Sequence, residues 1–591
     1  MRFRMIYAIL LTVLIEMIRL YRFLKPYTLH IIMIVILLFF QVISDLYLPS
    51  LMSDIVNNGI MNKDVPYILR TGGVMIAAAG VGIIAAIIAA FLSSKASVGL
   101  GKILREKIFA KVESFSLHEF DKLGTSTLIT RTTNDVTQIQ QVTVMILSMM
   151  ITAPLMCVGG IIMALREDKS LTWILVVVVP ILAAIIGSVL IKGIPLFKLM
   201  QIKLDKLNLV LRENLTGIRV IRAFNRIDRE KERFDDANKD LMDNAVKVNK
   251  IMAVLMPLMM LIMNLTTIAI IWFGAIQINE GNMQIGSLMA FIQYAMQILF
   301  SLLMLTLLFI LVPRAQASSL RINEVLDIKP EIVDPQSPIK AESKKGYVEF
   351  KNVTFGYQGS EQPAISGIDF TANPGEITAI IGSTGSGKST LVNLIPRFYD
   401  ADKGKVLVDG VDVRDMSQEN LRSKIGFVPQ NTVLFSGSIS ENIRYGKKDA
   451  TIEEIMHACD IAQATDFILE MENGFDHYIS AGGTNVSGGQ KQRLSIARAL
   501  VRRPEIYVFD DSFSALDFKT DAKLRAALKK EVADATVFII AQRVSTVMNA
   551  DRIIVLDDGK IAGIGKHREL LKSCEVYHEI VYSQLSEEEL A

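Results

Sequence analysis

Long apolar stretches fill the first half of the chain and stop near residue 315. Each is long enough to cross the roughly 30 Å hydrocarbon layer as a helix of about 20 residues. Stretches such as HIIMIVILLFFQVI lack the polar face of a buried helix in a soluble protein, which argues against one large soluble core. The pattern predicts six membrane spans, at residues 28–50, 70–93, 136–165, 170–194, 251–277 and 284–312.

The loops between these spans alternate in length and charge. Those after spans two and four are long and charged and keep a helical period, so we expect them to extend the spans as helices. Because cytoplasmic loops carry an excess of Lys and Arg, the N-terminus, these loops and the C-terminal half are predicted to be cytoplasmic. The basic residues concerned are Arg19, Arg22, Lys25, Lys95, Lys102, Arg105, Lys107, Lys111, Lys122 and Arg131.

The same pattern divides the chain into four parts. Residues 1–26 are predicted to lie as a helix on the cytoplasmic leaflet, because Glu16 interrupts the apolar run and no signal cleavage site follows. Residues 27–325 form the membrane domain, and residues 326–346, rich in Pro, Ser and charge, are typical of a linker. From 347 to 591, short apolar strands such as EITAIIG and TVFIIA alternate with helical patterns, which predicts an α/β domain.

Composition adds three constraints. Of 591 residues, 51% are hydrophobic, as in a chain that is part membrane protein and part soluble protein. The formal net charge is only +2, so no global basic field indicates nucleic acid as a partner. The three cysteines, Cys157, Cys459 and Cys574, are widely spaced and are expected to be small buried hydrophobes, and the histidines show no metal-binding spacing.

A phosphate-binding loop is predicted at GSTGSGKST, residues 382–390. The segment fits GxxxxGK[ST], follows the strand ITAII and precedes the helical LVNLI, which is the context that this motif requires. A glycine turn that happens to precede a lysine does not account for both spacing and context. Lys388 is expected to hold the β- and γ-phosphates, and the Ser389 hydroxyl to ligate Mg²⁺.

Two further segments indicate nucleotide chemistry. Asp510 ends the apolar strand IYVF and is the natural acidic partner of the Mg²⁺ in a P-loop NTPase. NVSGGQKQR, residues 485–493, places a Ser-Gly-Gly-Gln turn at the start of a helix, which offers backbone donors and a dipole to an anion. Taken alone, that turn also fits a plain capped helix start.

In this order the motifs resemble those of ATP-binding cassette (ABC) transporters, specifically half-size exporters of the type IV fold with six transmembrane helices and one nucleotide-binding domain. The resemblance covers the chain from about residue 20 and implies ATP and Mg²⁺ as cofactors. Val486 stands where the family's signature motif has leucine. The resemblance assigns Ser389, Gln430 and Asp510 to Mg²⁺, and to the nucleotide Tyr357, Gly382, Ser383, Thr384, Gly385, Ser386, Gly387, Lys388, Ser389, Thr390, Gln430, Ser487, Gly488, Gly489, Gln490 and Asp517.

Residues 120–140 and 212–226 resemble the two intracellular loops whose short helices dock on the nucleotide domains of this family. Solvated helical extensions describe the same segments equally well. The docking role is therefore implied by the resemblance alone.

Two positions depart from the family pattern. Asp511 stands where a glutamate normally orients the attacking water, and Gln542 stands where a histidine normally contacts the γ-phosphate. Aspartate is one methylene shorter, and a catalytic group displaced by about 1 Å can lose roughly 10²-fold in rate. Gln542 can donate a hydrogen bond but cannot carry imidazolium charge or move a proton. Both changes together predict a site that binds ATP and Mg²⁺ but hydrolyses poorly.

In this family two cassettes pair head to tail, and each ATP lies between the Walker motifs of one chain and the signature of the other. The resemblance therefore favours the degenerate-site subunit of a bacterial heterodimeric multidrug exporter. A second ABC half-transporter would supply the missing Glu and His, and residues 487–490 would complete that competent site. We expect a multi-pass protein of the bacterial plasma membrane that exports amphiphilic compounds and contacts membrane lipids. A homodimeric lipid flippase or peptide exporter with slow ATPase activity, or a nucleotide-binding regulatory subunit, remains an alternative.

The spans themselves give few clues to the substrate. Asp45 and Gln41 in span one are the main polar residues, and an intramembrane acid is a candidate functional group. Asp45 lies toward the outer end of its span, so solvation at the interface explains it equally well. Methionines of span five suit either an adaptable apolar cavity or packing and lipid contact, namely Met252, Met256, Met259, Met260 and Met263.

Overall fold

The computed structural model describes residues 16–340 and 345–584 of the chain. They form two compact units: one comprises the described residues up to Ser114 together with Leu123–Ile328, and the other comprises Phe115–Lys122 and the described residues from Lys329 onward. Most of the predicted N-terminal helix, residues 1–15, lies outside the described residues. From Glu16 the chain is helical, with a 3-10 turn at Arg22–Tyr27.

The first unit is a bundle of long helices, and six helical segments of the described chain are apolar and long enough to cross a membrane. The extension of α3 and α7 far beyond their apolar stretches confirms that the long loops continue the spans as helices. The long helices are α2 (Thr28–Asp54), α3 (Val65–Glu113), α6 (Val136–Glu167), α7 (Thr172–Thr216), α9 (Ile227–Asn279) and α10 (Ile285–Asp327). Shorter segments are α5 (Thr125–Thr130), α8 (Ile218–Ala223) and the π-helical η2 (Ile55–Ile60) and η3 (Arg131–Asp135).

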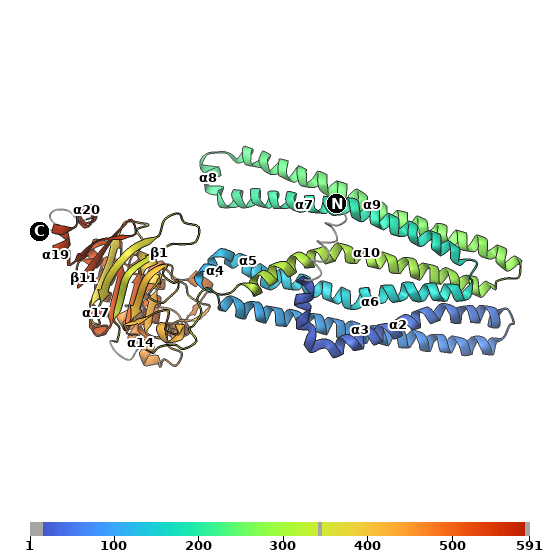
Figure 1. Cartoon of the computed structure of the whole chain (residues 1–591), viewed down its shortest axis with the longest axis horizontal. Coiled ribbons are helices and arrows are strands. Elements are labelled where there is room, and N and C mark those ends of the chain that lie inside the picture. Colours follow the sequence, from blue (N-terminus) through green and yellow to red (C-terminus); the bar gives the residue numbers. More distant parts are fainter. Residues whose placement is uncertain (1–15, 341–344, 585–591) are drawn as a thin grey trace. The chain divides into compact units, whose positions relative to one another are not determined.

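The long helices pack in pairs. Figure 1 shows α2, α3, α6 and α10 side by side, and α7 and α9 as a second antiparallel pair joined through α8. Within the bundle, Phe291, Tyr294 and Ile298 of α10 are fully buried against α2 and α6. The Tyr294 hydroxyl donates to the Leu46 carbonyl at 2.9 Å, which satisfies a polar group that would otherwise be costly in an apolar interior.

A charged cluster fastens α10 to η3 at the cytoplasmic side of this unit. The buried Asp135 carboxylate accepts hydrogen bonds from the Ser318 hydroxyl at 2.9 Å and from Nε of Arg321 at 2.7 Å. Arg131 donates to the Arg321 carbonyl at 3.1 Å and pairs with Glu324 at 2.8 Å. Because a buried carboxylate is stable only when it is paired, this cluster fixes the register of α10 against η3.

The second unit is the predicted α/β domain, and the expected strands are confirmed. Its six-stranded sheet has the order β12-β11-β3-β10-β9-β6, parallel except for the edge strand β12. A four-stranded antiparallel sheet has the order β2-β1-β4-β5, and a short hairpin pairs β7 with β8. The strands are β1 (Val348–Phe355), β2 (Ile365–Ala372), β3 (Ile377–Gly382), β4 (Lys403–Val408), β5 (Val411–Asp412), β6 (Ile425–Val428), β7 (Gly437–Ser438), β8 (Tyr478–Ile479), β9 (Ile506–Asp510), β10 (Thr536–Ile540), β11 (Arg552–Asp557) and β12 (Lys560–Gly565).

Apolar residues on both faces of the parallel sheet form the core of this unit. β9 and β10 are buried along their whole length, as expected for central strands covered on two sides. The helices of the unit are α4 (Leu117–Leu123, Leu123 itself belonging to the first unit), α11 (Lys388–Asn393), α12 (Gln418–Ser423), α13 (Ile439–Arg444), α14 (Ile452–Ile461), α15 (Thr465–Leu469), α16 (Gly488–Leu500), α17 (Phe518–Glu531), α18 (Val544–Val547), α19 (His567–Ser573) and α20 (Glu575–Tyr582).

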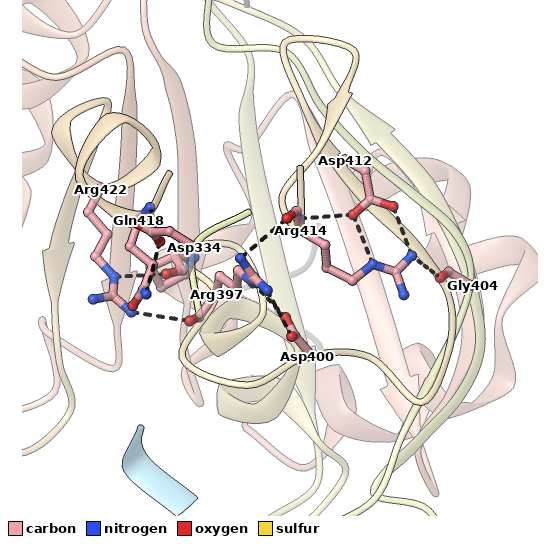
Figure 2. A network of polar contacts seen from close by, with 9 residues as sticks. Asp334, Arg397, Asp400, Gly404, Asp412, Arg414, Gln418 and Arg422 are labelled. Carbon is pink, nitrogen blue, oxygen red and sulfur yellow. Dashed lines mark hydrogen bonds and ion pairs between the residues drawn. The ribbon is translucent and has the colours of Figure 1, made fainter. Parts of the chain in front are cut away.

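The described part of the predicted linker is anchored rather than free. Asp334 accepts hydrogen bonds from the backbone and side-chain nitrogens of Gln418 at 3.0 and 3.1 Å, and the Ile339 N–H donates to the Asp415 carbonyl at 2.8 Å. Figure 2 shows how the polar contacts continue into the domain. They run through Arg422, Arg397 with Asp400, and Arg414 with Asp412.

One small expectation was wrong. Cys459 and Cys574 are buried, but Cys157 in α6 is only half-buried. Cys157 lies on a membrane helix, where apolar side chains can face lipid as well as the protein core. The apolar character of cysteine therefore did not predict burial at this position.

Candidate nucleotide-binding site

Parallel strands bring the predicted phosphate, magnesium and catalytic positions to one edge. The order β3-β10-β9-β6 makes neighbours of the strands that precede the phosphate loop, Gln542, the Asp510–Asp511 pair and Gln430. Ile540 of β10 lies opposite Asp510 of β9, so Gln542 emerges beside Asp511. The carboxyl edge of such a sheet is where open α/β folds bind ligands.

The phosphate loop runs from β3 into α11. Gly387 has φ +93 and Gly385 has φ +88, values that glycine adopts without strain. A Cβ at Gly387 would lie 2.7 Å from the Ala364 carbonyl oxygen, whereas the space around Gly385 is open. The buried Lys388 donates through its ammonium to the carbonyls of Gly382 and Ser383 at 2.8 and 2.6 Å, which fixes its side chain along the loop.

Two carboxylates and their donors face this loop. The Ser389 hydroxyl donates to Oδ1 of Asp510 at 3.0 Å. Nε2 of Gln542 donates to Oδ2 of Asp511 at 3.0 Å, and the Gln430 side chain hydrogen-bonds the same carboxylate. Asp511 is therefore held by two amides. Hydroxyl, carboxylate and amide oxygens are the donors that Mg²⁺ prefers, so this set fits the ion.

Burial sets the electrostatics of the site. Burial raises the pKa of Asp510, and the neighbouring Asp511 carboxylate raises it further, whereas the hydrogen bond from Ser389 lowers it. Burial also raises the pKa of Asp511, against the Gln430 hydrogen bond and the charges of Lys388 and Arg543. The pKa of Lys388 is lowered by burial, although both carboxylates oppose this. Burial thus disfavours the ionised form of both carboxyls, and a bound divalent cation would offset this cost.

Most of the predicted residues line one cavity of about 430 Å³. It is bounded by residues from the phosphate loop and from the ends of β9, β10 and β6, including Tyr357, Thr384, Gly385, Gly387, Lys388, Ser389, Thr390, Gln430, Asp510, Asp511 and Gln542. Gly382, Ser383 and Ser386 belong to the loop but do not line the cavity. Ser487, Gly488, Gly489, Gln490 and Asp517 also lie away from it.

The signature segment is a well-formed helix start. The Ser487 hydroxyl accepts from the Gln490 N–H at 3.3 Å, and Oε1 of Gln490 accepts from the Ser487 N–H at 2.8 Å, a complete capping box. A Cβ at Gly489 would lie 3.0 Å from the Ala515 carbonyl oxygen, so glycine permits close contact with the SALD segment. Asp517 caps α17 through the Thr520 N–H at 2.9 Å.

Sequence reasoning missed an aromatic cluster beside Tyr357. Tyr399 lies 5.5 Å from Tyr357, ring centre to ring centre, and its hydroxyl donates to Asp121 of α4 at 3.4 Å. Burial and the Asp121 carboxylate raise the pKa of Tyr399 to about 12. Only the FYD tripeptide after the helical LVNLIPR marks this residue in the sequence, and no motif points to it.

Residues 115–122 belong to the nucleotide-binding unit, although the membrane helices flank them in sequence. Glu119 accepts hydrogen bonds from the Ser116 N–H at 2.7 Å and from the Glu331 N–H at 2.9 Å. The residues just before the segment that resembles an intracellular loop (residues 120–140) thus contact the predicted linker. The corresponding helix α8 belongs to the membrane unit.

Comparison with protein families assigns both halves. Residues 31–302 match the family described as ABC transporter transmembrane region, and residues 365–514 match the family described as ABC transporter. An uncharacterized ABC transporter ATP-binding protein of Mycobacterium tuberculosis is 43% identical over 95% of this chain and 97% of its own length. YfiB of Bacillus subtilis, also uncharacterized, is 40% identical over 96% of this chain and 98% of its own length.

Relatives with named substrates are more distant. A fatty acid ABC transporter ATP-binding/permease protein of Mycobacterium bovis is 34% identical over 81% of this chain and 75% of its own. A solved structure of a bacterial Atm1-family ABC exporter with ATP bound superposes with a TM-score of 0.79 at 26% identity, covering 95% of this chain and 99% of that one. The chain is thus a multi-pass membrane protein with a cytoplasmic ATPase domain, and it belongs to the ABC transporter family as a half-transporter with the Atm1-family exporter fold.

Proposed function

We propose that this chain is one subunit of an ATP-driven heterodimeric exporter of amphiphilic compounds in a bacterial plasma membrane. Residues 27–325 act as the membrane domain and residues 347–591 as the nucleotide domain. The chain's own site binds ATP and Mg²⁺ through the phosphate loop, Tyr357, Gln430 and Asp510, but turns over slowly. Its signature segment completes the faster site of a second half-transporter.

The hydrogen bond between Gln542 and Asp511 carries this proposal. A general base must hold a free carboxylate oxygen toward the attacking water. Asp511 is one methylene shorter than the family's glutamate, and its carboxylate accepts from the amides of Gln542 and Gln430. Lys388, Ser389 and Asp510 line the same cavity, and Ser389 donates to Asp510, which supports phosphate and Mg²⁺ binding there. The residues at positions 511 and 542 therefore weaken activation of the attacking water, whereas the residues that would bind phosphate and Mg²⁺ are unchanged.

The signature segment supports the second half of the proposal. Its capping box orders the first turn of α16 and uses the N–H groups of Ser487 and Gln490, so the amides of Gly488 and Gly489 are the ones offered to an anion. Nothing in its local geometry is impaired, in contrast to the Asp511–Gln542 pair. This chain thus combines altered catalytic positions in its own nucleotide site with an intact signature segment for its partner's site. That combination is expected in a heterodimer whose two nucleotide sites differ in activity.

Steady-state ATPase activity of the exporter, purified with its copurifying chain, tests the asymmetry. Asp511→Asn should lower the activity by less than about threefold, because this site contributes little turnover. Exchange of the partner's catalytic glutamate for glutamine should lower it by roughly 10²-fold or more. Lys388→Ala serves as the control that removes nucleotide binding at this site.

Complete loss of turnover in Asp511→Asn would contradict the degenerate-site proposal. Full activity of a preparation that contains this chain alone would contradict the heterodimer. That second outcome would favour a homodimeric flippase. One observation supports this alternative: an ATP-dependent lipid A-core flippase of Vibrio parahaemolyticus is 30% identical over 96% of this chain and 98% of its own length.

A further inference from the structure

A cavity of about 580 Å³ lies in the outer half of the membrane unit, between α2, α6 and α10. Its wall combines six polar side chains, Gln41, Asp45, Thr152, Gln293, Gln297 and Ser301, with the apolar Ala153, Met156, Ile292, Met296, Phe300 and Met304. Asp45 thus borders this partly open cavity. The methionines of α9 are not among the lining residues; those of α6 and α10 take this place.

The orientation of Gln297 is fixed by its own hydrogen bond. Nε2 donates to the Asp45 carbonyl at 3.2 Å, and only the nitrogen of an amide can donate to a carbonyl. The other terminal atom of the amide is therefore Oε1. This oxygen is buried without a hydrogen-bond partner among the described residues. A buried unsatisfied acceptor in an apolar region is costly, and a ligand N–H that reached Oε1 would remove this cost.

A second acceptor lies beside it. The Asp45 carboxylate borders the same cavity, and Gln41, one helical turn earlier on α2, hydrogen-bonds it. No lysine, arginine or histidine is among the described residues that line the cavity. The carboxylate thus has no cationic partner in the wall, and an intramembrane acid is stable when it meets one.

We propose that this cavity binds the protonated amine head group of an amphiphile, with Asp45 as counter-charge and Oε1 of Gln297 as hydrogen-bond acceptor. A primary or secondary ammonium matches both, because it combines positive charge with N–H donors. Met156, Met296 and Phe300 then contact the first part of the apolar tail; methionine adapts to varied shapes. The inference rests on the proposed export of amphiphiles and assigns the substrate class as cationic.

Three photoreactive probes of equal chain length test this preference: a diazirine-bearing hexadecylamine, the matching hexadecanoate and the matching hexadecanol. The exporter, purified in its native oligomeric form, is placed in nanodiscs of zwitterionic lipid. Labelled peptides that cover α6 and α10 are quantified by mass spectrometry. The amine should label the cavity segments of these helices most strongly, and Asp45→Asn should reduce that labelling roughly tenfold, equivalent to about 1.4 kcal/mol.

Matched variants separate the site from general effects. Asp54→Asn makes the same chemical change at the end of α2, outside the cavity, and should label like the native chain. Asp45→Glu keeps the charge and should retain most of the labelling, whereas Gln297→Leu should weaken it. Equal labelling by the carboxylate, or amine labelling that is unchanged in Asp45→Asn, would overturn the proposal.

The two proposals fail separately. If the amine probe does not depend on Asp45 while ATPase activity remains asymmetric, only the cationic substrate class is wrong. If labelling depends on Asp45 while Asp511→Asn abolishes turnover, the degenerate-site role is wrong and the cavity assignment stands.

Discussion

Asp511 and Gln542 act as a unit, because each side chain satisfies the other at 3.0 Å. Replacing Asp511 alone removes this acceptor from the Gln542 amide, whereas replacing Gln542 alone leaves Asp511 with the Gln430 amide as its donor. Asp511 also has φ +47, a left-handed conformation in which aspartate is more common than most residues. A glutamate there is expected to lower stability slightly even as it restores reach.

The double variant Asp511→Glu with Gln542→His should raise ATP hydrolysis at this chain's own site. The longer carboxylate regains about 1 Å of reach, and the imidazole restores a group that can carry a proton. Such changes can raise the rate of hydrolysis roughly 10²-fold. The increase is measured as ATPase activity in an exporter whose partner site carries the glutamine substitution. Either single change should give a smaller increase.

Asp510→Glu is the matched control, since it makes the same chemical change one residue earlier. It displaces the carboxylate that accepts from Ser389 and should lower activity rather than raise it. An unchanged rate in the double variant would show that these two residues do not limit hydrolysis at this site.

Motif spacing predicted the cavity-lining residues of the nucleotide site because consecutive residues and adjacent parallel strands fix them locally. Tyr399 and Gln297 could not be predicted in the same way. Tyr399 reaches Tyr357 only through the fold of the loop after α11. Gln297 is one of many polar residues in the spans, and its role follows from a contact with Asp45 on a helix distant in sequence.

At the scale of elements, Glu119 connects the segment around α4 to the linker. Burial alone would raise the pKa of Glu119, but hydrogen bonds from Ser116 and from the Glu331 N–H outweigh it and hold the pKa below 4.5. For a carboxyl with a depressed pKa, the stabilisation is complete above its unfolded value and is lost as the pH falls through the folded one. The contact should therefore persist at pH 7 and weaken below pH 4.5.

Glu119→Gln should expose the Glu331 amide to exchange at pH 7. Loss of a hydrogen bond to a charged acceptor is expected to speed exchange of this amide roughly tenfold. Hydrogen–deuterium exchange of the peptide around residue 331 measures the effect.

Glu331→Gln is the internal control for this measurement. It leaves the backbone donor in place, so exchange at position 331 should stay close to the native rate at pH 7. Equal acceleration in both variants would mean that the Glu331 side chain, rather than the carboxylate of Glu119, protects this amide.

Helix existence was predictable, whereas helix ends and packing were not. The period of apolar residues located the spans, but charged extensions have no apolar boundary, and α7 continues to Thr216. The linker looked free because Pro, Ser and charge resemble a flexible segment. Its anchoring by Gln418 and Asp415 depends on residues that the sequence places far away.

For the whole molecule, the charge of the loops predicts which end of each helix faces outward. Native thiols give little background, since Cys459 and Cys574 are buried and Cys157 is half-buried. A single cysteine at the exposed Asn62, between α2 and α3, should react with a membrane-impermeant maleimide in intact cells. A cysteine at the exposed Ala223, between α7 and α9, should react only after the cells are opened.

Reaction of both positions in intact cells, or of the Ala223 variant alone, would contradict the topology. Labelling of both variants in detergent shows that each thiol is accessible. The comparison thus depends on the membrane barrier and not on local burial.

Helix α10 links two features of the membrane unit along one continuous helix. It is continuous from Ile285 to Asp327, with Gln297 at the cavity and Arg321 fastened to Asp135. At about 1.5 Å rise per residue, these two points are about 36 Å apart, so a tilt of about 10° around Arg321 displaces Gln297 by about 6 Å. That is about twice the length of a hydrogen bond. With an amine head group bound as we propose, small rotations at the cytoplasmic end would be amplified into making or breaking its contact with Gln297.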